Sequence, residues 1–350
     1  MKYLNKIKKR NAVLFLLLSL LCYSCNHETL FKGNFIFRQS GPSLLLQGEK
    51  IADVVPGFRE VIIADTFLLA FTPANRKGLL SVGSTNTGKL LYKDLILKGR
   101  GPGEYLNIDY AGRETDSGKV KIWLGANGYR KLVRLNLAES LEKGRPVIER
   151  EIPCGPGAAA GVLGVFRGTG DLLLLYQYNM SEKNFNVMKY DVGNNIARKA
   201  GSVYNQPVDL TDGSAQVLYN PKYPYLVISS VFFNRIYFYD FTAPGRSFSV
   251  STDKSPVEYE DLKRIPVSER ELYYLSSFCT DEMLGFLYNR KGESFVQFWD
   301  WKGNLLGNVQ LAQAATRISY SYPDSSLYAS NFTEETVYKY DLSGLDFISR

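Results

Sequence analysis

A short pattern that recurs along this chain constrains its fold more than any other feature. Each copy is an alternating run that ends in an aromatic residue and Asp, followed by a polar or glycine-containing turn. The Asp residues of these copies are Asp191, Asp240, Asp300 and Asp341. Alternating β-branched and aromatic residues favour strands, Asp bonds to the backbone of the turn that follows it, and Gly accepts a positive φ. The pattern therefore predicts a series of antiparallel hairpins.

The spacing of the hairpins indicates their arrangement. Asn136 ends a fifth, weaker copy, and the intervals from Asn136 to Asp341 are 55, 49, 60 and 41 residues. A four-stranded propeller blade needs about 40 to 50 residues. A further hairpin at 79–92 adds one unit to the five. The sequence thus predicts an all-β fold over residues 35–350, a six-bladed β-propeller with four-stranded antiparallel blades.

The interval of 60 residues has a local cause. Ser255 and Ser268 each precede a Glu by three residues, at Glu258 and Glu271, which is the pattern of a helix N-terminal capping box. We therefore expect a short helical insertion near 255–276, with helices at about 256–264 and 269–275. Such an insertion commonly covers one mouth of the channel or makes a partner surface. The alternative is a longer connection without a function.

A propeller must also join its two ends, because a free blade edge exposes unpaired backbone groups. We expect a strand from residues 35–50 to complete the blade that the C-terminal residues 316–348 begin. The two ends of the folded region would then meet in one sheet.

The N-terminus predicts a cellular location. Residues 1–10 are basic, and residues 12–21 form an apolar run that is long enough for a signal peptide but too short for a membrane span. Ser24 then precedes Cys25, as in the lipobox of bacterial lipoproteins. We expect a lipoprotein signal peptide at 1–24, lipid on Cys25, and a lipid-anchored tether at 25–34. An ordinary secretory signal with an incidental cysteine is the alternative.

The formal charge of +7 depends on this segment. Five basic residues and no acidic residue precede position 25, so the remaining chain has 37 basic and 35 acidic residues. A nearly neutral protein has no general electrostatic attraction to nucleic acid. We therefore expect no nucleic-acid partner.

Histidine and cysteine limit the chemistry further. His27 is the single histidine and lies in the predicted tether, which argues against Ser-His-Asp and Cys-His catalysis and against His-ligated metal sites. Carboxylates, Tyr, Lys, Arg or an oxygen-ligated ion such as calcium remain. Cys154 and Cys279 fall in non-adjacent blades, so we expect two unpaired, mostly buried thiols.

The densest turn pattern in the chain is Gly99-Arg100-Gly101-Pro102-Gly103-Glu104-Tyr105. With the lipobox and the aromatic-Asp hairpins, it resembles the six-bladed β-propeller lipoproteins of the TolB-like and NHL-like kind, found in Gram-negative cell envelopes. Asn107 and Ile108 stand where the family's following proline is expected, and Cys154-Gly155-Pro156-Gly157 is a shortened echo of the run. The resemblance implies an outer-membrane lipoprotein, facing the periplasm or the outside. Such propellers include binding modules, protein-interaction platforms and a minority of enzymes.

No catalytic set stands out from these patterns. We expect a non-enzymatic module that binds a partner protein or an extracellular ligand with its loop faces and channel mouth, without a cofactor. Candidate channel or partner-surface residues are Arg100, Glu104, Tyr105, Glu258 and Tyr259. The competing interpretation is a propeller hydrolase or lyase that uses channel-lining carboxylates, with or without calcium.

Overall fold

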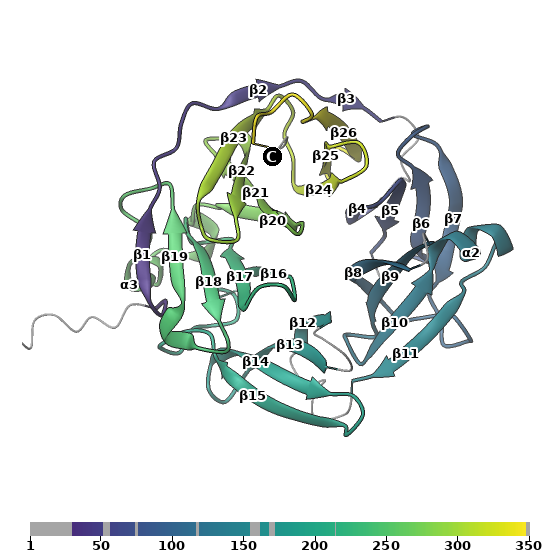
Figure 1. The fold of residues 1–350 in the computed structure, drawn as a ribbon, viewed down its shortest axis with the longest axis horizontal. Helices are drawn as coiled ribbons and strands as arrows, with labels where there is room; N and C mark the ends of the chain where they lie inside the picture. The colour runs from purple at the N-terminus through teal and green to yellow at the C-terminus, as the bar shows by residue number, and fades with distance from the viewer. Residues whose placement is uncertain are drawn as a thin grey trace, which may run out of the picture.

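A computed structural model describes residues 30–51, 57–73, 76–116, 119–154, 162–167, 172–213 and 215–347. In these residues six sheets stand in a ring, each built on antiparallel blade strands, and the inner strand of each lies nearest the centre (Figure 1). The predicted six-bladed β-propeller is confirmed.

The first three blades follow one another along the chain. Blade 1 contains β4 (Glu60–Ala64), β5 (Phe67–Phe71), β6 (Gly78–Ser84) and β7 (Leu90–Leu97). Blade 2 contains β8 (Ile108–Asp116), β9 (Lys119–Ala126), β10 (Lys131–Asn136) and β11 (Ile148–Pro153), with helix α2 (Leu137–Lys143) before its outer strand. Blade 3 contains β12 (Val162–Arg167), β13 (Leu172–Asn179), β14 (Asn184–Asp191) and β15 (Ile196–Ser202).

The other three blades each include a strand from the N-terminal segment. Blade 4 contains β16 (Ala215–Tyr219), β17 (Tyr225–Ser230), β18 (Ile236–Asp240) and β19 (Phe248–Ser251), with a 3₁₀ turn η1 (Pro244–Arg246), and β1 (Asn34–Phe37) at its outer edge. Blade 5 contains β20 (Tyr274–Cys279), β21 (Met283–Arg290), β22 (Glu293–Asp300) and β23 (Leu305–Leu311), with β2 (Leu44–Leu46) outside. Blade 6 contains β24 (Arg317–Ser321), β25 (Ser326–Asn331) and β26 (Thr336–Asp341), completed by β3 (Glu49–Lys50).

The N-terminal segment runs along the outside of these three blades, as the purple ribbon in Figure 1 shows. β1 pairs in parallel with β19, β2 pairs in parallel with β23, and β3 pairs antiparallel with β26. The predicted closure of the ring by a strand from residues 35–50 is therefore confirmed. The two parallel pairings go beyond that prediction.

The two faces of the ring carry different connections. Because adjacent strands within each blade are antiparallel, all six inner strands begin at the same face. We call this the entry face. It carries the loops that follow the outer strands and the turns between the second and third strands of each blade.

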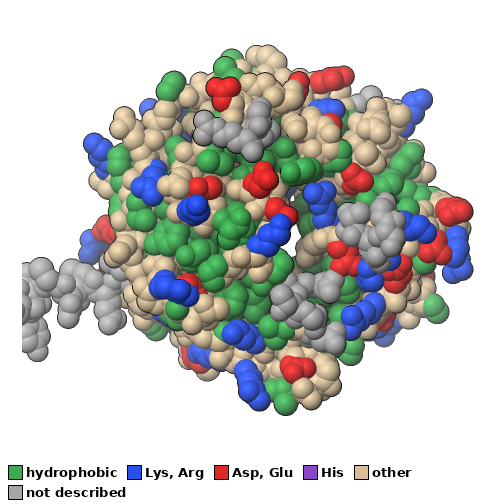
Figure 2. Space-filling model, viewed as in Figure 1, with side chains coloured by type: hydrophobic (Ala, Val, Ile, Leu, Met, Phe, Trp, Pro, Cys, Tyr) green, Lys and Arg blue, Asp and Glu red, His purple; other side chains and the backbone are tan. Residues whose placement is uncertain are grey.

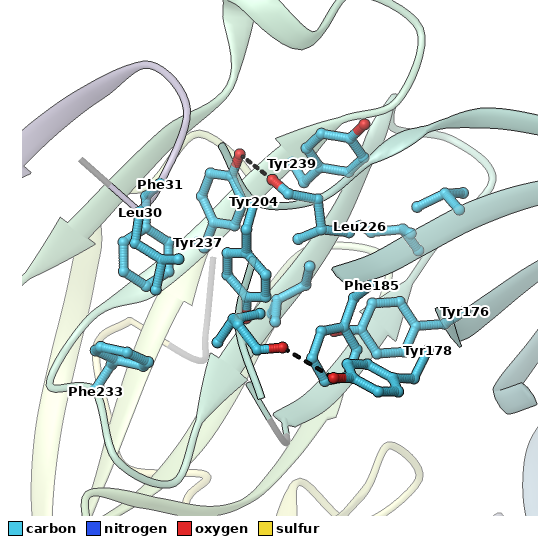
Figure 3. Packing of buried hydrophobic residues seen from close by; sticks show 14 of the residues in the cluster. Leu30, Phe31, Tyr176, Tyr178, Phe185, Tyr204, Leu226, Phe233, Tyr237 and Tyr239 are labelled. Atoms are coloured by element: carbon cyan, nitrogen blue, oxygen red, sulfur yellow. Dashed lines mark hydrogen bonds between the residues drawn. The ribbon is translucent and has the colours of Figure 1, made fainter. Parts of the chain in front are cut away.

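The hydrophobic core lies between the blades. Six clusters of buried residues each join two neighbouring blades, so that together they form a continuous ring of packing. Figure 3 shows the cluster between blades 3 and 4, in which the Tyr204 ring contacts both Phe185 and the N-terminal Phe31. Burial of such rings is the main favourable contribution to folding.

The recurring Asp residues end strands, as the sequence predicts. Each is the last residue of the third strand of its blade. The Asp300 carboxylate accepts hydrogen bonds from the amides of Lys302 and Asn304, at 2.9 and 2.8 Å. Asp341 accepts one from the Ser343 amide at 2.8 Å. The repeat is therefore structural, because the carboxylates are engaged by their own turns.

Asp240 provides a test of this role because its side chain is fully buried, whereas Asp341 is exposed. Burial by itself raises the pKa of Asp240, but hydrogen bonds from Thr242 and the Ala243 amide, with Arg246 nearby, lower it overall. Asp240→Ala is expected to lower the free energy of unfolding at pH 7 by about 2 kcal/mol.

The pH dependence follows from the lowered pKa. The stability that Asp240 contributes is present above its ordinary pKa of 3.8 and is lost as the pH falls below that value. Urea titrations of both proteins from pH 3 to 7 should therefore converge at the acid end. A larger effect from Asp341→Ala at pH 7 would contradict this account.

The insertion between blades 4 and 5 lies where it was predicted, but its helices are shorter. Helix α3 covers only Tyr259–Leu262, and a 3₁₀ turn, η2, covers Val267–Glu269. The short helical insertion near 255–276 is confirmed, and α3 lies within the first predicted helix at 256–264. The second predicted helix at 269–275 and the predicted caps Ser255 and Ser268 are wrong, since Glu258 and Pro266 precede the two elements.

Tertiary contacts explain the shorter helices. The Asn234 side chain accepts a hydrogen bond from the Val257 amide at 2.7 Å, and Arg235 donates to the Val257 carbonyl at 3.0 Å. These contacts hold residues 257–258 extended. At the other end, residues from Tyr274 onward join blade 5 as β20, where alternate side chains are buried. Sheet pairing thus overrides the local capping preference.

Candidate functional site

The candidate site is a cavity of about 340 Å³ in the channel, toward the entry face. Its walls come from the first residues of the inner strands of several blades, so no single blade forms it. Its lining residues are Arg59, Glu60, Asp109, Tyr110, Tyr129, Leu163, Gly164, Val165, Phe166, Tyr176, Ala215, Gln216, Val217 and Arg317. Figure 2 shows the hollow at the centre of the ring, with basic and acidic side chains around it. A volume of this size admits a small ligand.

Two arginines give the cavity positive charge. Arg59 pairs with Asp109 at 2.8 Å and bridges blades 1 and 2. Arg317, at the start of β24, donates to the carbonyls of Leu275 and Thr316, at 3.2 and 2.8 Å. These bonds fix the Arg317 guanidinium beside the cavity, and in the part of the chain that the structure describes no further acceptor bonds to it, which leaves donors for a ligand.

Glu60 is the unusual group of the site. Among the described residues, none makes a hydrogen bond to its carboxylate, although it lies among the charges of Arg59, Arg317 and Asp109. Desolvation raises the pKa of Glu60; the two arginines act in the opposite direction, and Asp109 raises it further. The Glu60 side chain is half-buried, so it keeps some access to water from the cavity. A partly desolvated carboxylate that faces a cavity without a hydrogen-bond partner is a candidate functional group.

Tyr129 lines the cavity in a strained backbone conformation. Its φ is 59°, in the left-handed region that bulky residues rarely occupy, and it follows Asn127 and Gly128, whose φ values are also positive. Two hydrogen bonds of 2.8 Å hold the turn: the Asn127 side chain accepts one from the Leu106 amide, and the Asn107 side chain accepts one from the Gly128 amide. Strain of this kind persists only where the surroundings enforce it.

The Tyr129 ring lies against the backbone of Gly125, and a Cβ at that position would overlap the ring. Gly125→Ala is therefore expected to push the ring out of place and to weaken ligand binding about tenfold, roughly 1.4 kcal/mol. The cost in folding stability should be about 1 to 2 kcal/mol.

Urea unfolding would measure the loss of stability, and titration with a molecule that binds in the cavity would measure the loss of affinity. Gly245→Ala is the control, because an added Cβ there meets no atom within 4 Å. Unchanged affinity in Gly125→Ala would show that Tyr129 takes no part in the site.

The Gly99–Tyr105 run forms a tight turn between β7 and β8. Glu104 accepts a hydrogen bond from the Gly101 amide at 2.9 Å, so this amide is not free for an anion. Tyr105 is buried and donates to Glu151 at 2.7 Å, while Arg100 is exposed. None of these three candidates lines the cavity. The turn leads directly into Asn107, which bonds to the turn of Tyr129, and into Asp109, which lines the cavity.

The other two candidates lie in the insertion. Glu258 pairs with Arg235 at 2.7 Å, and Tyr259 is buried in the cluster between blades 3 and 4. The Tyr259 hydroxyl also accepts a hydrogen bond from the Asp209 amide at 3.3 Å. The structure thus keeps this pair apart from the Gly99–Tyr105 turn and outside the cavity lining.

Sequence reasoning missed the residues that line the cavity. Glu60, Asp109 and Arg317 belong to unrelated stretches of sequence that meet only when the ring closes. One signal was available: each stands at the start of an inner strand, and these starts share one mouth of a propeller.

The described residues include no group of three or more His, Cys, Asp or Glu side chains placed to hold a metal ion. Both thiols are unpaired, and they lie in blades 2 and 5 as expected. Burial raises the pKa of Cys154 to about 11 and that of Cys279 to about 12, which disfavours the reactive thiolate at neutral pH. Among the described helices, none is long and apolar enough to cross a membrane.

Comparison with known proteins supports the fold. No protein-family model and no curated protein sequence matches the chain. A solved structure of a presumed exported protein from Bacteroides fragilis aligns with a TM-score of 0.51 and 15% identity, covering 88% of this chain and 99% of the other. The β-propeller domain of Cps50 (Swd1) from Myceliophteria thermophila aligns with a TM-score of 0.45 and 11% identity, over 84% and 100%. The chain is a six-bladed β-propeller with a charged cavity at its entry face.

Proposed function

We propose that this protein is a non-enzymatic binding module of the cell envelope, anchored through lipid on Cys25, whose ligand binds in the channel cavity. The outer membrane of a Gram-negative cell is the proposed location. The lipobox supports the anchor, and the Bacteroides fragilis neighbour, itself presumed exported, is consistent with that location.

The Glu60 carboxylate is the observation that carries the proposal. It lines the cavity half-buried, it accepts no hydrogen bond from the described residues, and the Arg317 guanidinium lies in the same cavity. A ligand with an amine or hydroxyl group would satisfy Glu60, and an acceptor or anionic group on it would engage Arg317. Tyr110 and Tyr129 add flat apolar surface. The cavity therefore suits a small polar molecule or a polar side chain of a partner protein.

The test is purification of the lipidated protein from its own membranes, followed by mass spectrometry of the small molecules and proteins that accompany it. Wild type is compared with Glu60→Gln and with Glu293→Gln, whose side chain is exposed at the start of β22. We expect one species to be depleted only from Glu60→Gln. Identical profiles from all three proteins would contradict a ligand in this cavity.

A hydrolase or lyase is the second candidate, favoured by the raised pKa of Glu60 beside Asp109 in one cavity. Two carboxylates in different surroundings are what general acid and base chemistry uses. Assays with sugar and ester panels, with and without calcium, would test it. Turnover that Glu60→Gln abolishes would replace the binding-module proposal with an enzyme.

A further inference from the structure

The chain enters the propeller very close to the proposed lipid anchor. Leu30 and Phe31 are buried, at 1% and 4% exposure, in the cluster between blades 3 and 4. Figure 3 shows both side chains beside Tyr237. Cys25 is only five residues before Leu30, so the intervening chain spans at most about 18 Å. The propeller surface around Leu30 is therefore held near the membrane whenever Cys25 carries lipid.

The contacts of Leu30 and Phe31 fix which surface that is. The Leu30 carbonyl accepts a hydrogen bond from the Asn205 amide at 3.0 Å, in the loop 203–214 on the entry face. The Phe31 ring packs against Phe233 with centroids 5.3 Å apart, and the Arg235 guanidinium lies 4.6 Å from its centre. The anchor thus leads to the entry face at blades 3 and 4.

Three loops next to this point are bonded into one surface. Arg235 also binds Glu258 of the insertion at 2.7 Å, and the Phe233 ring lies 6.4 Å from that of Tyr259 in α3. Loop 203–214 is tied to the turn of blade 3, because the Val208 amide donates to the Lys183 carbonyl at 2.7 Å. The buried pair of Arg270 with Asp212 joins this loop to the insertion.

This surface exposes large apolar side chains. Met180 is 76% exposed in the turn of blade 3, and Leu210 is 43% exposed in loop 203–214. Ile265, Val267 and Leu272 are 40, 50 and 47% exposed in the insertion. Among the described loops, the entry face carries two further exposed large apolar residues, Leu106 and Phe332, whereas the opposite face carries Tyr322.

We propose that Met180, Leu210, Ile265, Val267 and Leu272 form a docking surface that inserts into the headgroup region of the bilayer to which Cys25 is anchored. The inference rests on the proposed lipidation. Acyl chains that hold the protein at the bilayer make even a weak apolar contact effective, because the second attachment becomes intramolecular.

The charges near the docking surface identify the lipid. Two acidic and two basic side chains pair within the insertion, Glu260 with Lys263 at 2.6 Å and Asp261 with Arg264 at 3.5 Å. Its Glu258 and Arg270 pair with residues of neighbouring loops, and Glu269 and Glu271 add negative charge. Such a surface has no net attraction for anionic headgroups. The partner is therefore a zwitterionic lipid surface, and docking should depend little on salt.

Docking at this edge is compatible with a ligand in the channel. The docking surface consists of loops of blades 3 and 4 and of the insertion before blade 5. The charged lining residues Arg59, Asp109 and Arg317 belong to blades 1, 2 and 6, and blades 3 and 4 line the cavity with strand residues that are not part of the docking surface. A ring that rests on one edge is tilted, and the channel mouth stays open toward the other edge. The ligand would then be taken up near the membrane surface.

The test uses the full lipidated protein in phosphatidylcholine vesicles. Val267→Cys and Phe332→Cys each receive a small fluorophore; the two sites are 50 and 48% exposed on the same face, but Phe332 lies in blade 6. Among the described thiols Cys154 is buried and Cys279 partly buried, so the protein without an added cysteine is labelled in parallel to measure the background. Nitroxide-bearing lipids quench only labels that reach the bilayer, so we expect about threefold stronger quenching at position 267 than at position 332.

The outcomes separate the two proposals. If mass spectrometry finds no acyl chains on Cys25, the anchor is wrong and the docking inference falls with it. If Cys25 is acylated and the label at 267 is quenched no more than the label at 332, the anchor stands and the docking surface is wrong. Quenching at 267 that appears only after a membrane protein is added would assign the surface to a protein partner and overturn the inference.

Discussion

Deletion of residues 30–50 is expected to abolish the cooperative folding of the propeller. This segment pairs with the outer strands of blades 4 and 5 and supplies the fourth strand of blade 6. Its loss would expose three strand edges and would leave empty the space between blades 3 and 4 that Leu30 and Phe31 fill. Circular dichroism and urea unfolding would measure the loss of a sharp transition.

The junction between the last and first blades makes the segment especially important. The described cluster between blades 6 and 1 is the smallest of the six and includes Phe58, Val61, Tyr328 and Val337. Blade 6 is completed by β3, the Ile51 amide bonds to the Val337 carbonyl at 2.9 Å, and the Ile63 amide of blade 1 donates to the Ser319 hydroxyl of blade 6 at 2.8 Å. The N-terminal segment therefore adds main-chain pairing to a junction that has little side-chain burial of its own.

A single substitution separates the contribution of side-chain packing to stability from that of main-chain pairing. Phe31→Ala should lower the free energy of unfolding by about 3 to 5 kcal/mol, because it empties a fully packed aromatic site. Phe35→Ala is the matched control in the same segment, since Phe35 is 38% exposed, and it should cost about 0.5 kcal/mol. Equal effects of the two substitutions, or an unaltered transition after the deletion, would show that the segment is peripheral.

The sequence was most informative where structure depends on local chemistry. The Asp residues at 191, 240, 300 and 341 mark the ends of third strands because an Asp caps the turn that follows it, whatever the rest of the fold does. The position of the closing strand also followed from a general requirement, since sheet edges must be covered. Both kinds of reasoning are independent of distant contacts.

Prediction failed where distant contacts decide the conformation. The capping pattern at Ser255 was overridden by Asn234 and Arg235, which lie some twenty residues earlier and hold the backbone at Val257 extended. The cavity was beyond prediction for the same reason. Glu60 and Arg317 are at opposite ends of the sequence, and only the closed ring makes them neighbours.

Glu60→Gln is expected to stabilise the free protein while it abolishes ligand binding. Functional residues often reduce folding stability, and replacing one of them typically raises the free energy of unfolding by about 0.5 to 2 kcal/mol. Glutamine has the same shape as glutamate without the charge whose desolvation raises the pKa of Glu60. Thermal melting at pH 7 should therefore show a higher midpoint for the variant, while the species that co-purifies with wild type is lost.

The pH dependence tests the cause of this gain. The folded-state pKa of Glu60 is above its ordinary value of 4.5, so the folded protein holds this proton more tightly than the unfolded chain. Stability contributed by Glu60 is then greatest below pH 4.5 and falls as the pH rises from there through the folded-state pKa. The advantage of Glu60→Gln should grow over that range and should vanish below it.

Glu293→Gln controls for the general effect of removing a negative charge, and its melting midpoint should follow wild type at every pH. A Glu60→Gln protein that is less stable than wild type at pH 7 would mean that the carboxylate holds the channel together by pairing with Arg59 and Arg317. In that case the cavity is a structural ion network. A more stable variant that no longer retains the ligand requires the opposite conclusion: the fold maintains an unfavourable charge at the channel mouth, and the ligand compensates it.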